Sequence, residues 1–144
     1  MKKLLIITLG IFIITCSTAE KKSAEALWRD GQQFRSEKQL KDAIISFNII
    51  ISEYSKNNLA VQAQFQIADI YLNDIKDFEF AIEEFLKVVH NYPDHEESKK
   101  SLFMIAYVYN NYLDAYSDAK NYYNIFKEKY PEDELIPSVE YELE

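Results

Sequence analysis

Residues 78–93 read FEFAIEEFLKVVHNYP, and this stretch decides the fold. Its apolar residues recur at the spacings that place side chains on one face of an α-helix: Phe78, Ala81, Ile82, Phe85, Val88 and Val89. The same stripe occurs thirty-eight residues later, starting at Tyr116, and thirty-eight residues earlier, starting at Leu40. The chain therefore contains three copies of one unit, and a period of this length predicts stacked repeats.

Composition limits the class of protein. A chain of 144 residues has room for one domain, and an apolar content of 48% excludes a disordered chain. Only 2 glycines and 3 prolines break the sequence, which favours long helices and an all-α fold. The formal net charge of −8 repels phosphate backbones, so we expect no nucleic-acid partner.

Each unit reads as two helices joined by a short turn. The first helices are expected to begin near Ser23, Asn58 and Asp94. The second helices are expected at 40–54, 78–93 and 115–130, after turns at Ser36–Gln39, Asn73–Lys76 and Asn111–Asp114. Residues 23–131 thus hold three repeats. Residues 132–144 are expected to form a capping helix or a truncated fourth repeat, because stacked repeats need a polar-faced end.

The repeated positions resemble the tetratricopeptide repeat, in which a small residue, an aromatic, an alanine, a second aromatic and a proline recur. In this chain these positions hold Gly31, Ala68 and Ala106; Phe34, Tyr71 and Tyr109; Ala43, Ala81 and Ala119; Phe47, Phe85 and Tyr123; and Ser55, Pro93 and Pro131. Only Ser55 departs from the pattern. Small residues let two helices approach closely, and proline ends the second helix.

This resemblance implies a right-handed superhelical solenoid of three tetratricopeptide-like helix pairs plus a C-terminal capping helix. The long period and the Tyr-Pro ends, as at Tyr92-Pro93, are similar to the repeats of BamD-type outer-membrane assembly lipoproteins and CpoB-type Tol-Pal accessory proteins. The similarity is to this subfamily of repeats and to neither protein.

The N-terminus reads as a signal peptide. Lys2 and Lys3 precede an apolar run from Leu4 to Ile14 that is too short to span a bilayer as a helix. The end of this run, Ile13-Ile14-Thr15-Cys16, resembles a bacterial lipobox, although Thr15 replaces the usual Gly, Ala or Ser. The resemblance implies a signal peptide over 1–15, lipidation of Cys16 and a tether over 16–22. The alternative is an ordinary secretory signal with an incidental cysteine.

The residue after the cysteine bears on location. In lipoproteins of this kind, an Asp there favours retention at the inner membrane, and here the residue is Ser17. The resemblance therefore implies an outer-membrane lipid anchor facing the periplasm.

The family resemblance also implies a concave groove lined by the first helices. Carried over residue by residue, it places these side chains in a partner-binding groove: Trp28, Gln32, Arg35, Phe65, Asp69, Leu72, Lys100, Phe103 and Tyr107. Gln62 occupies the same groove-lining repeat position as Lys100. Aromatic anchors surrounded by polar groups suit recognition of a protein or peptide. The alternative for the recurring aromatics Trp28, Phe65 and Phe103 is packing in the core.

Catalytic and metal chemistry find little support in the sequence. His90 and His95 could bind zinc, but they flank a proline-terminated helix end and no motif sets a third ligand, so a solvated turn is the simpler interpretation. Glu83 and Glu84 are adjacent, so their carboxylates point in different directions on a helix. They therefore cannot act as general acid and base on the two sides of one substrate bond. We expect no enzyme activity, no cofactor and no metal.

The sequence therefore predicts a lipid-anchored periplasmic scaffold that binds another protein, in cell-envelope or outer-membrane assembly. Two alternatives are open: a carrier for a small envelope ligand, such as a peptidoglycan fragment or a metal, and an accessory domain of an enzyme. A carrier requires a closed pocket with convergent polar groups, whereas a scaffold requires an open groove.

Overall fold

The computed structural model describes residues 21–143, and its regular elements in that range are all helices. Three pairs are stacked along the chain, the second containing a π-helix, η1. The elements are α1 (Ala24–Ser36), α2 (Leu40–Glu53), α3 (Asn58–Asp69), η1 (Ile70–Ile75), α4 (Phe78–Asn91), α5 (Glu96–Asn111), α6 (Tyr116–Lys129) and α7 (Ile136–Leu143).

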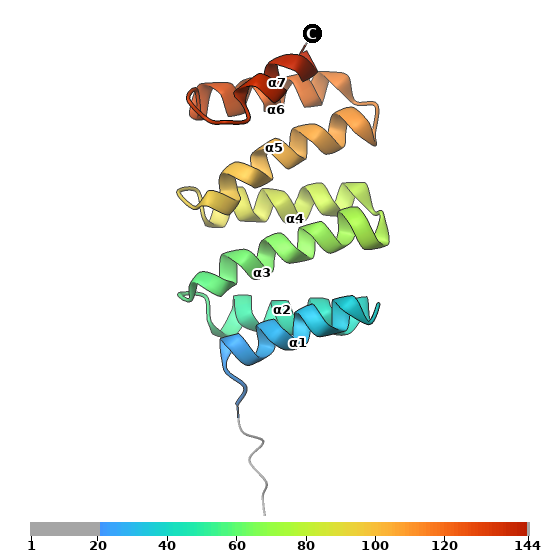
Figure 1. Cartoon of the computed structure of the whole chain (residues 1–144), viewed down its shortest axis with the longest axis vertical. Helices are drawn as coiled ribbons and strands as arrows, with labels where there is room; N and C mark the ends of the chain where they lie inside the picture. Colours follow the sequence, from blue (N-terminus) through green and yellow to red (C-terminus); the bar gives the residue numbers. More distant parts are fainter. Residues whose placement is uncertain (1–20, 144) are drawn as a thin grey trace, which may run out of the picture.

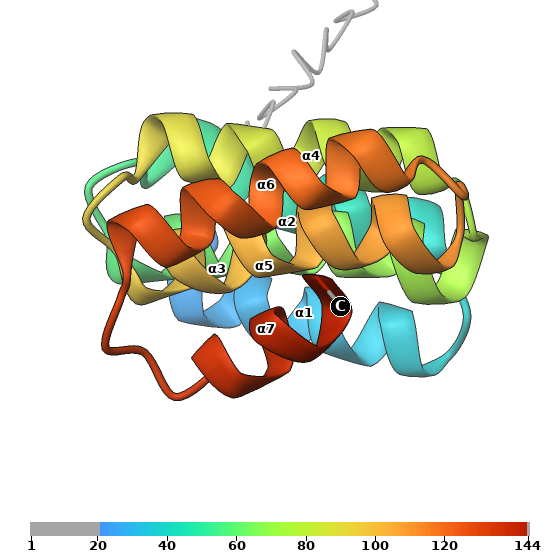
Figure 2. The same ribbon diagram turned by 90° about the horizontal axis from the view of Figure 1, so that it is seen from above.

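The helix pairs form an elongated stack with α1 at one end and α7 at the other (Figure 1). Viewed along the stack, the second helices α2, α4 and α6 form one layer, and the first helices α1, α3 and α5 form the other (Figure 2). Each helix packs mainly against its neighbours in sequence, as in a solenoid. The predicted all-α solenoid is confirmed.

The repeat signature forms the interior of this stack. Its alanines are buried between the helices of each pair, as are Gly31 and the second aromatic position, which holds Phe47, Phe85 and Tyr123. These residues fall into three core clusters, one centred on each repeat. The small residues allow close helix packing, and the buried rings fill the space beside them.

Local capping defines where the helices begin. The side chains of Ser23, Asn57, Asp77 and His95 accept backbone N–H groups in the first turns of α1, α3, α4 and α5. These bonds satisfy donors that an isolated helix start leaves unpaired.

The turn within each pair contains one residue with a left-handed backbone. These residues are Lys38, Lys76 and Asp114, at φ of 62°, 63° and 52°. Their equivalent place after α1, η1 and α5 shows that all three repeats reverse direction by the same device.

The turns of the second and third repeats are one residue longer than that of the first. In the first, Gln39 N–H bonds to Phe34 C=O, whereas in the others Asp77 bonds to Tyr71 and Ala115 bonds to Tyr109. In the second repeat the extra residue is accommodated by η1, as π-helical turns accommodate a widened helix. The predicted turn at Asn73–Lys76 is therefore helical up to Ile75.

The C-terminal segment packs on the third repeat as helix α7. Val139 is fully buried in the third core cluster, and Leu135, Ile136 and Leu143 pack against that cluster. Lys127 of α6 contacts Glu140 at 3.1 Å. The helix lies on the same side of the stack as the first helices (Figure 2), where the first helix of a fourth repeat would stand.

Candidate groove across the first helices

A shallow pocket of about 250 Å³ crosses the first helices of all three repeats. Its lining comes from α1, α3 and α5: Trp28, Gln62, Phe65, Gln66, Glu97 and Lys100. Two aromatic faces thus stand beside two amides, a carboxylate and an ammonium group. Lys100 is exposed and the other five side chains are partly buried. This arrangement offers apolar contact together with groups that hydrogen-bond a peptide.

Trp28 and Phe65, two of the three recurring aromatics, pack against the core and also line the groove. The Trp28 ring packs on buried Phe47 with centroids 5.4 Å apart, and the Phe65 ring packs on buried Phe85 at the same distance. Both rings nevertheless line the pocket. Each ring therefore covers its own repeat with one part and faces the groove with another.

Phe103 differs from its equivalents in the first two repeats. It packs edge-on against Tyr123 and Phe126, with centroids 5.8 and 6.0 Å apart, and belongs to the third core cluster. It does not line the pocket. Tyr107 lies one turn further along α5, where its ring is half-buried near those of Phe103 and Tyr112. Burial raises the pKa of the Tyr107 phenol, and Tyr112 and Glu142 raise it further.

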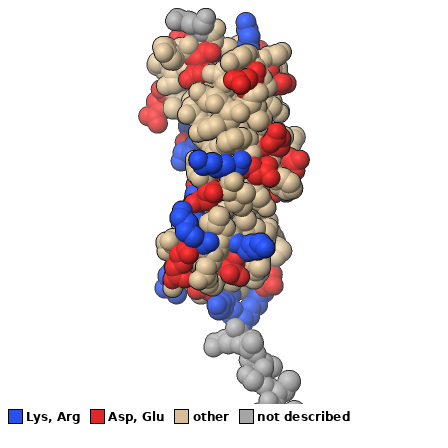
Figure 3. All heavy atoms as spheres, turned by 90° about the vertical axis from the view of Figure 1, so that its right-hand side faces the viewer, with Lys and Arg blue, Asp and Glu red and all other residues tan. Residues whose placement is uncertain are grey.

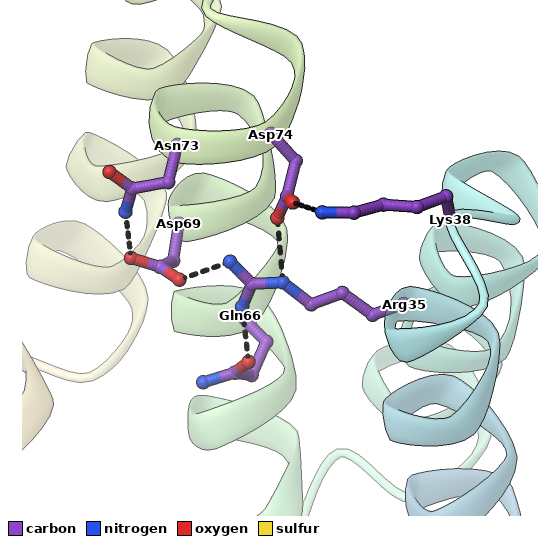
Figure 4. A network of polar contacts seen from close by, with 6 residues as sticks. All are labelled: Arg35, Lys38, Gln66, Asp69, Asn73 and Asp74. Atoms are coloured by element: carbon purple, nitrogen blue, oxygen red, sulfur yellow. Dashed lines mark hydrogen bonds and ion pairs between the residues drawn. The ribbon is translucent and has the colours of Figure 1, made fainter.

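Arg35 and Asp69, both expected in the groove, bind each other instead. Arg35 Nη2 lies 2.6 Å from Asp69 Oδ2, and Arg35 Nε donates to Asp74 Oδ2 at 2.7 Å. Arg35 also donates to Gln66 Oε1 at 2.9 Å, and Lys38 Nζ lies 2.9 Å from Asp74 Oδ1. Figure 4 shows the guanidinium of α1 enclosed by side chains of α3 and η1. This network joins the first repeat to the second.

Arg35 and Asp74 shift each other's pKa within this network. Burial by itself would lower the pKa of Arg35, but Asp69 and Asp74 raise it above its usual value. Burial by itself would raise the pKa of Asp74, but its bonds to Lys38 and Arg35 bring it below its usual value. Arg35 and Asp74 are therefore both held in their ionised forms.

Leu72 was expected in the groove, but it lies in the core. It is 3% exposed and packs in the second core cluster with Ala68, Ile82 and Ile105. It belongs to η1, and a π-helix has more residues in each turn than an α-helix, so its side chains point in different directions from those of α1. Gln32, the remaining predicted residue, is partly buried on α1.

Sequence reasoning missed two residues of the pocket, Gln66 and Glu97. Gln66 lies four residues after Gln62, on the same face of α3, so helical spacing offered a signal. Glu97 lies three residues before Lys100 in α5, and its carboxylate contacts the His95 ring. Because residues three apart on a helix are neighbours, this spacing offered a signal as well.

Neither histidine lines the groove. His95 caps α5, and its Nε2 lies 2.7 Å from Asn58 Oδ1 at the start of α3. His90 is an exposed residue of the last turn of α4. Within residues 21–143, no three side chains of His, Cys, Asp or Glu gather in a way that could hold a metal ion.

The membrane predictions fall on the N-terminus. The signal peptide, Cys16 and most of the tether lie outside the described residues. Over the range that the structure does describe, none of the helices has the length and apolar content needed to cross a bilayer.

Comparison with known families agrees with the repeat register. Residues 62–95 and 100–133 each match the family model described as Tetratricopeptide repeat. No curated protein shows significant sequence similarity to the chain. The two matched repeats and the stacked helix pairs support a tetratricopeptide-repeat protein, a class that commonly serves as a scaffold for protein–protein interaction.

Proposed function

We propose that this protein is a lipid-anchored scaffold on the periplasmic side of the outer membrane, where it binds another protein during cell-envelope assembly. The scaffold role follows from the tetratricopeptide fold, which typically has no catalytic function of its own. The anchor and the location are supported by the sequence around Cys16 alone.

The observation that carries the binding role is the pocket shared by three repeats. Trp28 of α1, Phe65 of α3 and Lys100 of α5 line it together, although they are far apart in the sequence. Two aromatic rings surrounded by polar side chains are the composition of a protein-binding hot spot. A bound peptide would therefore contact all three repeats.

The size of the pocket favours a scaffold over a carrier of small ligands. Ligand pockets usually enclose roughly 300–1,000 Å³ and bury most of the ligand, whereas this pocket measures about 250 Å³. A larger hollow of about 570 Å³ lies between the loops around Pro93 and Pro131. Its lysine Lys99 is already paired with Asp133 at 2.7 Å and with Glu96 at 3.0 Å, so these three charged groups bind each other.

Charge reversal at the groove tests the proposal. Lys100→Glu should leave folding intact, because the side chain is exposed, and should abolish recovery of partners cross-linked to the full chain in membranes. The matched control is Lys120→Glu, an equally exposed change on α6 away from the pocket. Equal recovery of partners by both variants would refute the groove. A small molecule co-purifying with the wild type and absent from Lys100→Glu would favour the carrier.

A further inference from the structure

Exposed apolar side chains gather at one edge of the solenoid, away from the groove. This turn edge consists of the turns that join the two helices of the second and third repeats. It carries Ile75, Phe80, Tyr112 and Tyr116, which are 41%, 46%, 44% and 63% exposed. They are four of the seven large apolar side chains exposed within residues 21–143. Because a soluble surface rarely concentrates such residues, the edge has the composition of an interaction surface.

Aromatic stacking holds the rings of the turn edge in place and joins its two repeats. The Phe78 ring at the start of α4 stacks on the Tyr112 ring at the end of α5, with centroids 4.5 Å apart. Phe80 stacks on Tyr71 with centroids 5.2 Å apart, so its position is also fixed. Rings held in place before binding lose little conformational entropy when a partner arrives.

The fold does not require apolar residues at positions 80 and 112. When the repeats are aligned on Ala43 and Ala81, Phe80 corresponds to Asp42, and Tyr112, aligned on Ala119, corresponds to Ser36. The first repeat forms its turn with these polar residues and with the same left-handed backbone at Lys38. Phe80 and Tyr112 therefore serve something other than the turn itself.

The charges beside these rings are predominantly acidic. The segments 75–80 and 112–118 contain four acids, Asp77, Glu79, Asp114 and Asp118, against the single base Lys76. Figure 3 looks onto this edge: acidic side chains flank uncharged surface in its upper half, and most of the Lys and Arg side chains lie at or below its middle. Aromatic faces and carboxylates both attract cations.

We propose that the turn edge is a second interaction surface, which takes a basic protein segment with Arg or Lys beside an apolar side chain. The apolar group packs on the exposed rings, and the cation lies over a ring face and near the carboxylates. A second copy of this chain fits poorly, because a two-fold contact would place the same acidic residues opposite each other. The surface shares no residue with the groove lining and does not depend on the groove function.

The probe is a peptide selected from a library of short random peptides displayed on phage. The bait in this selection is the full chain in detergent. The selected peptides are then synthesised, and their affinity is measured by fluorescence anisotropy. The edge variant is Phe80→Asp with Tyr112→Ser, which installs the residues of the first repeat. The control is Lys100→Glu in the groove. We expect peptides that combine basic and apolar residues and that bind the edge variant on the order of thirtyfold more weakly, the effect of losing one aromatic hot spot.

Binding should be unchanged in Lys100→Glu and should weaken as salt is added. The proposal would be overturned if the selected peptides lacked basic residues or bound the edge variant as tightly as the wild type. It would also be overturned if binding were lost in Lys100→Glu alone. Wild-type dimers that dissociate in the edge variant on sedimentation would also overturn it, by assigning the edge to a second copy. If the edge variant melts early, Tyr116→Ser, at a largely exposed ring, replaces it with the same expectation.

Discussion

The Phe47 ring lies directly against the backbone of Gly31. A Cβ atom added at position 31 would stand 2.6 Å from Phe47 Cε1 and 2.8 Å from Cζ. Phe47 is fully buried, and the Trp28 ring packs on it. Because the ring has no free space to enter, this contact sets how closely α1 and α2 approach.

Gly31→Ala should therefore destabilise the protein by about 1–2 kcal/mol. Overpacking costs about 1–3 kcal/mol, and the better helix propensity of alanine offsets roughly 1 kcal/mol of it. A urea titration measures the change in the free energy of unfolding. In a Phe47→Leu background the same substitution should be neutral or stabilising, because the clashing ring atoms are gone. A wild-type background that is stabilised by Gly31→Ala would contradict the close contact.

Phe103→Ala should behave as a core substitution, at about 3 kcal/mol or more. Its ring packs against Tyr123 and Phe126 and does not line the pocket. Circular-dichroism melting measures the loss of stability, and recovery of partners should follow the folded fraction. Phe103→Leu, which keeps most of the volume, is the control and should cost less. Lost partners with near-native melting would instead place Phe103 in the groove.

Asp74→Asn should weaken the joint between the first and second repeats by about 1–2 kcal/mol, since it removes the charge that Arg35 and Lys38 bind. The pKa of Asp74 is lowered in the folded protein. Its contribution is therefore complete above the unfolded value of about 4 and is lost as the pH falls through the folded value.

The difference in unfolding free energy between wild type and Asp74→Asn should accordingly shrink as the pH falls below about 4. Urea titrations of both proteins across that range measure it. A difference that stays constant down to the lowest accessible pH would show that the carboxylate charge does not stabilise the joint.

Lys76→Gly should stabilise the protein by about 1 kcal/mol. Lys76 has φ of 63°, a left-handed conformation that costs a non-glycine residue roughly 1 kcal/mol or more. The control makes the same substitution at Lys120, an exposed position inside α6, where glycine should cost about 1 kcal/mol. Thermal melting should thus shift in opposite directions for the two variants. A shift to lower temperature in both would show that the turn at Lys76 is not strained.

Cys16→Ser should prevent lipidation, because a hydroxyl cannot form the thioether that the lipobox resemblance implies. Metabolic labelling with a palmitate analogue measures the attached lipid, and fractionation of the envelope shows the membrane that holds the protein. Equal labelling of wild type and variant would exclude the lipoprotein.

The sequence by itself determined the class of fold and the register of the repeats. Alanines 81 and 119 recur with buried partners such as Phe85 and Tyr123 because every repeat must close the same gap between two helices. A requirement that is local to one helix pair leaves a periodic trace in the sequence. The family resemblance, applied to this register, placed Trp28, Phe65 and Lys100 in one groove, and all three line the pocket.

The tertiary structure alone decided which of the expected groove residues are free. Arg35 meets Asp69 and Asp74 across two repeats, and the longer second turn forms η1, which buries Leu72. Phe78 and Tyr112 meet in the same way, across the junction of the second and third repeats. Such contacts depend on the angle at which successive helix pairs stack and on one added turn residue. The stacking angle leaves no periodic trace in the sequence. The added residue is shared by the second and third turns but forms a π-helix only in the second, so the repeat pattern does not predict η1.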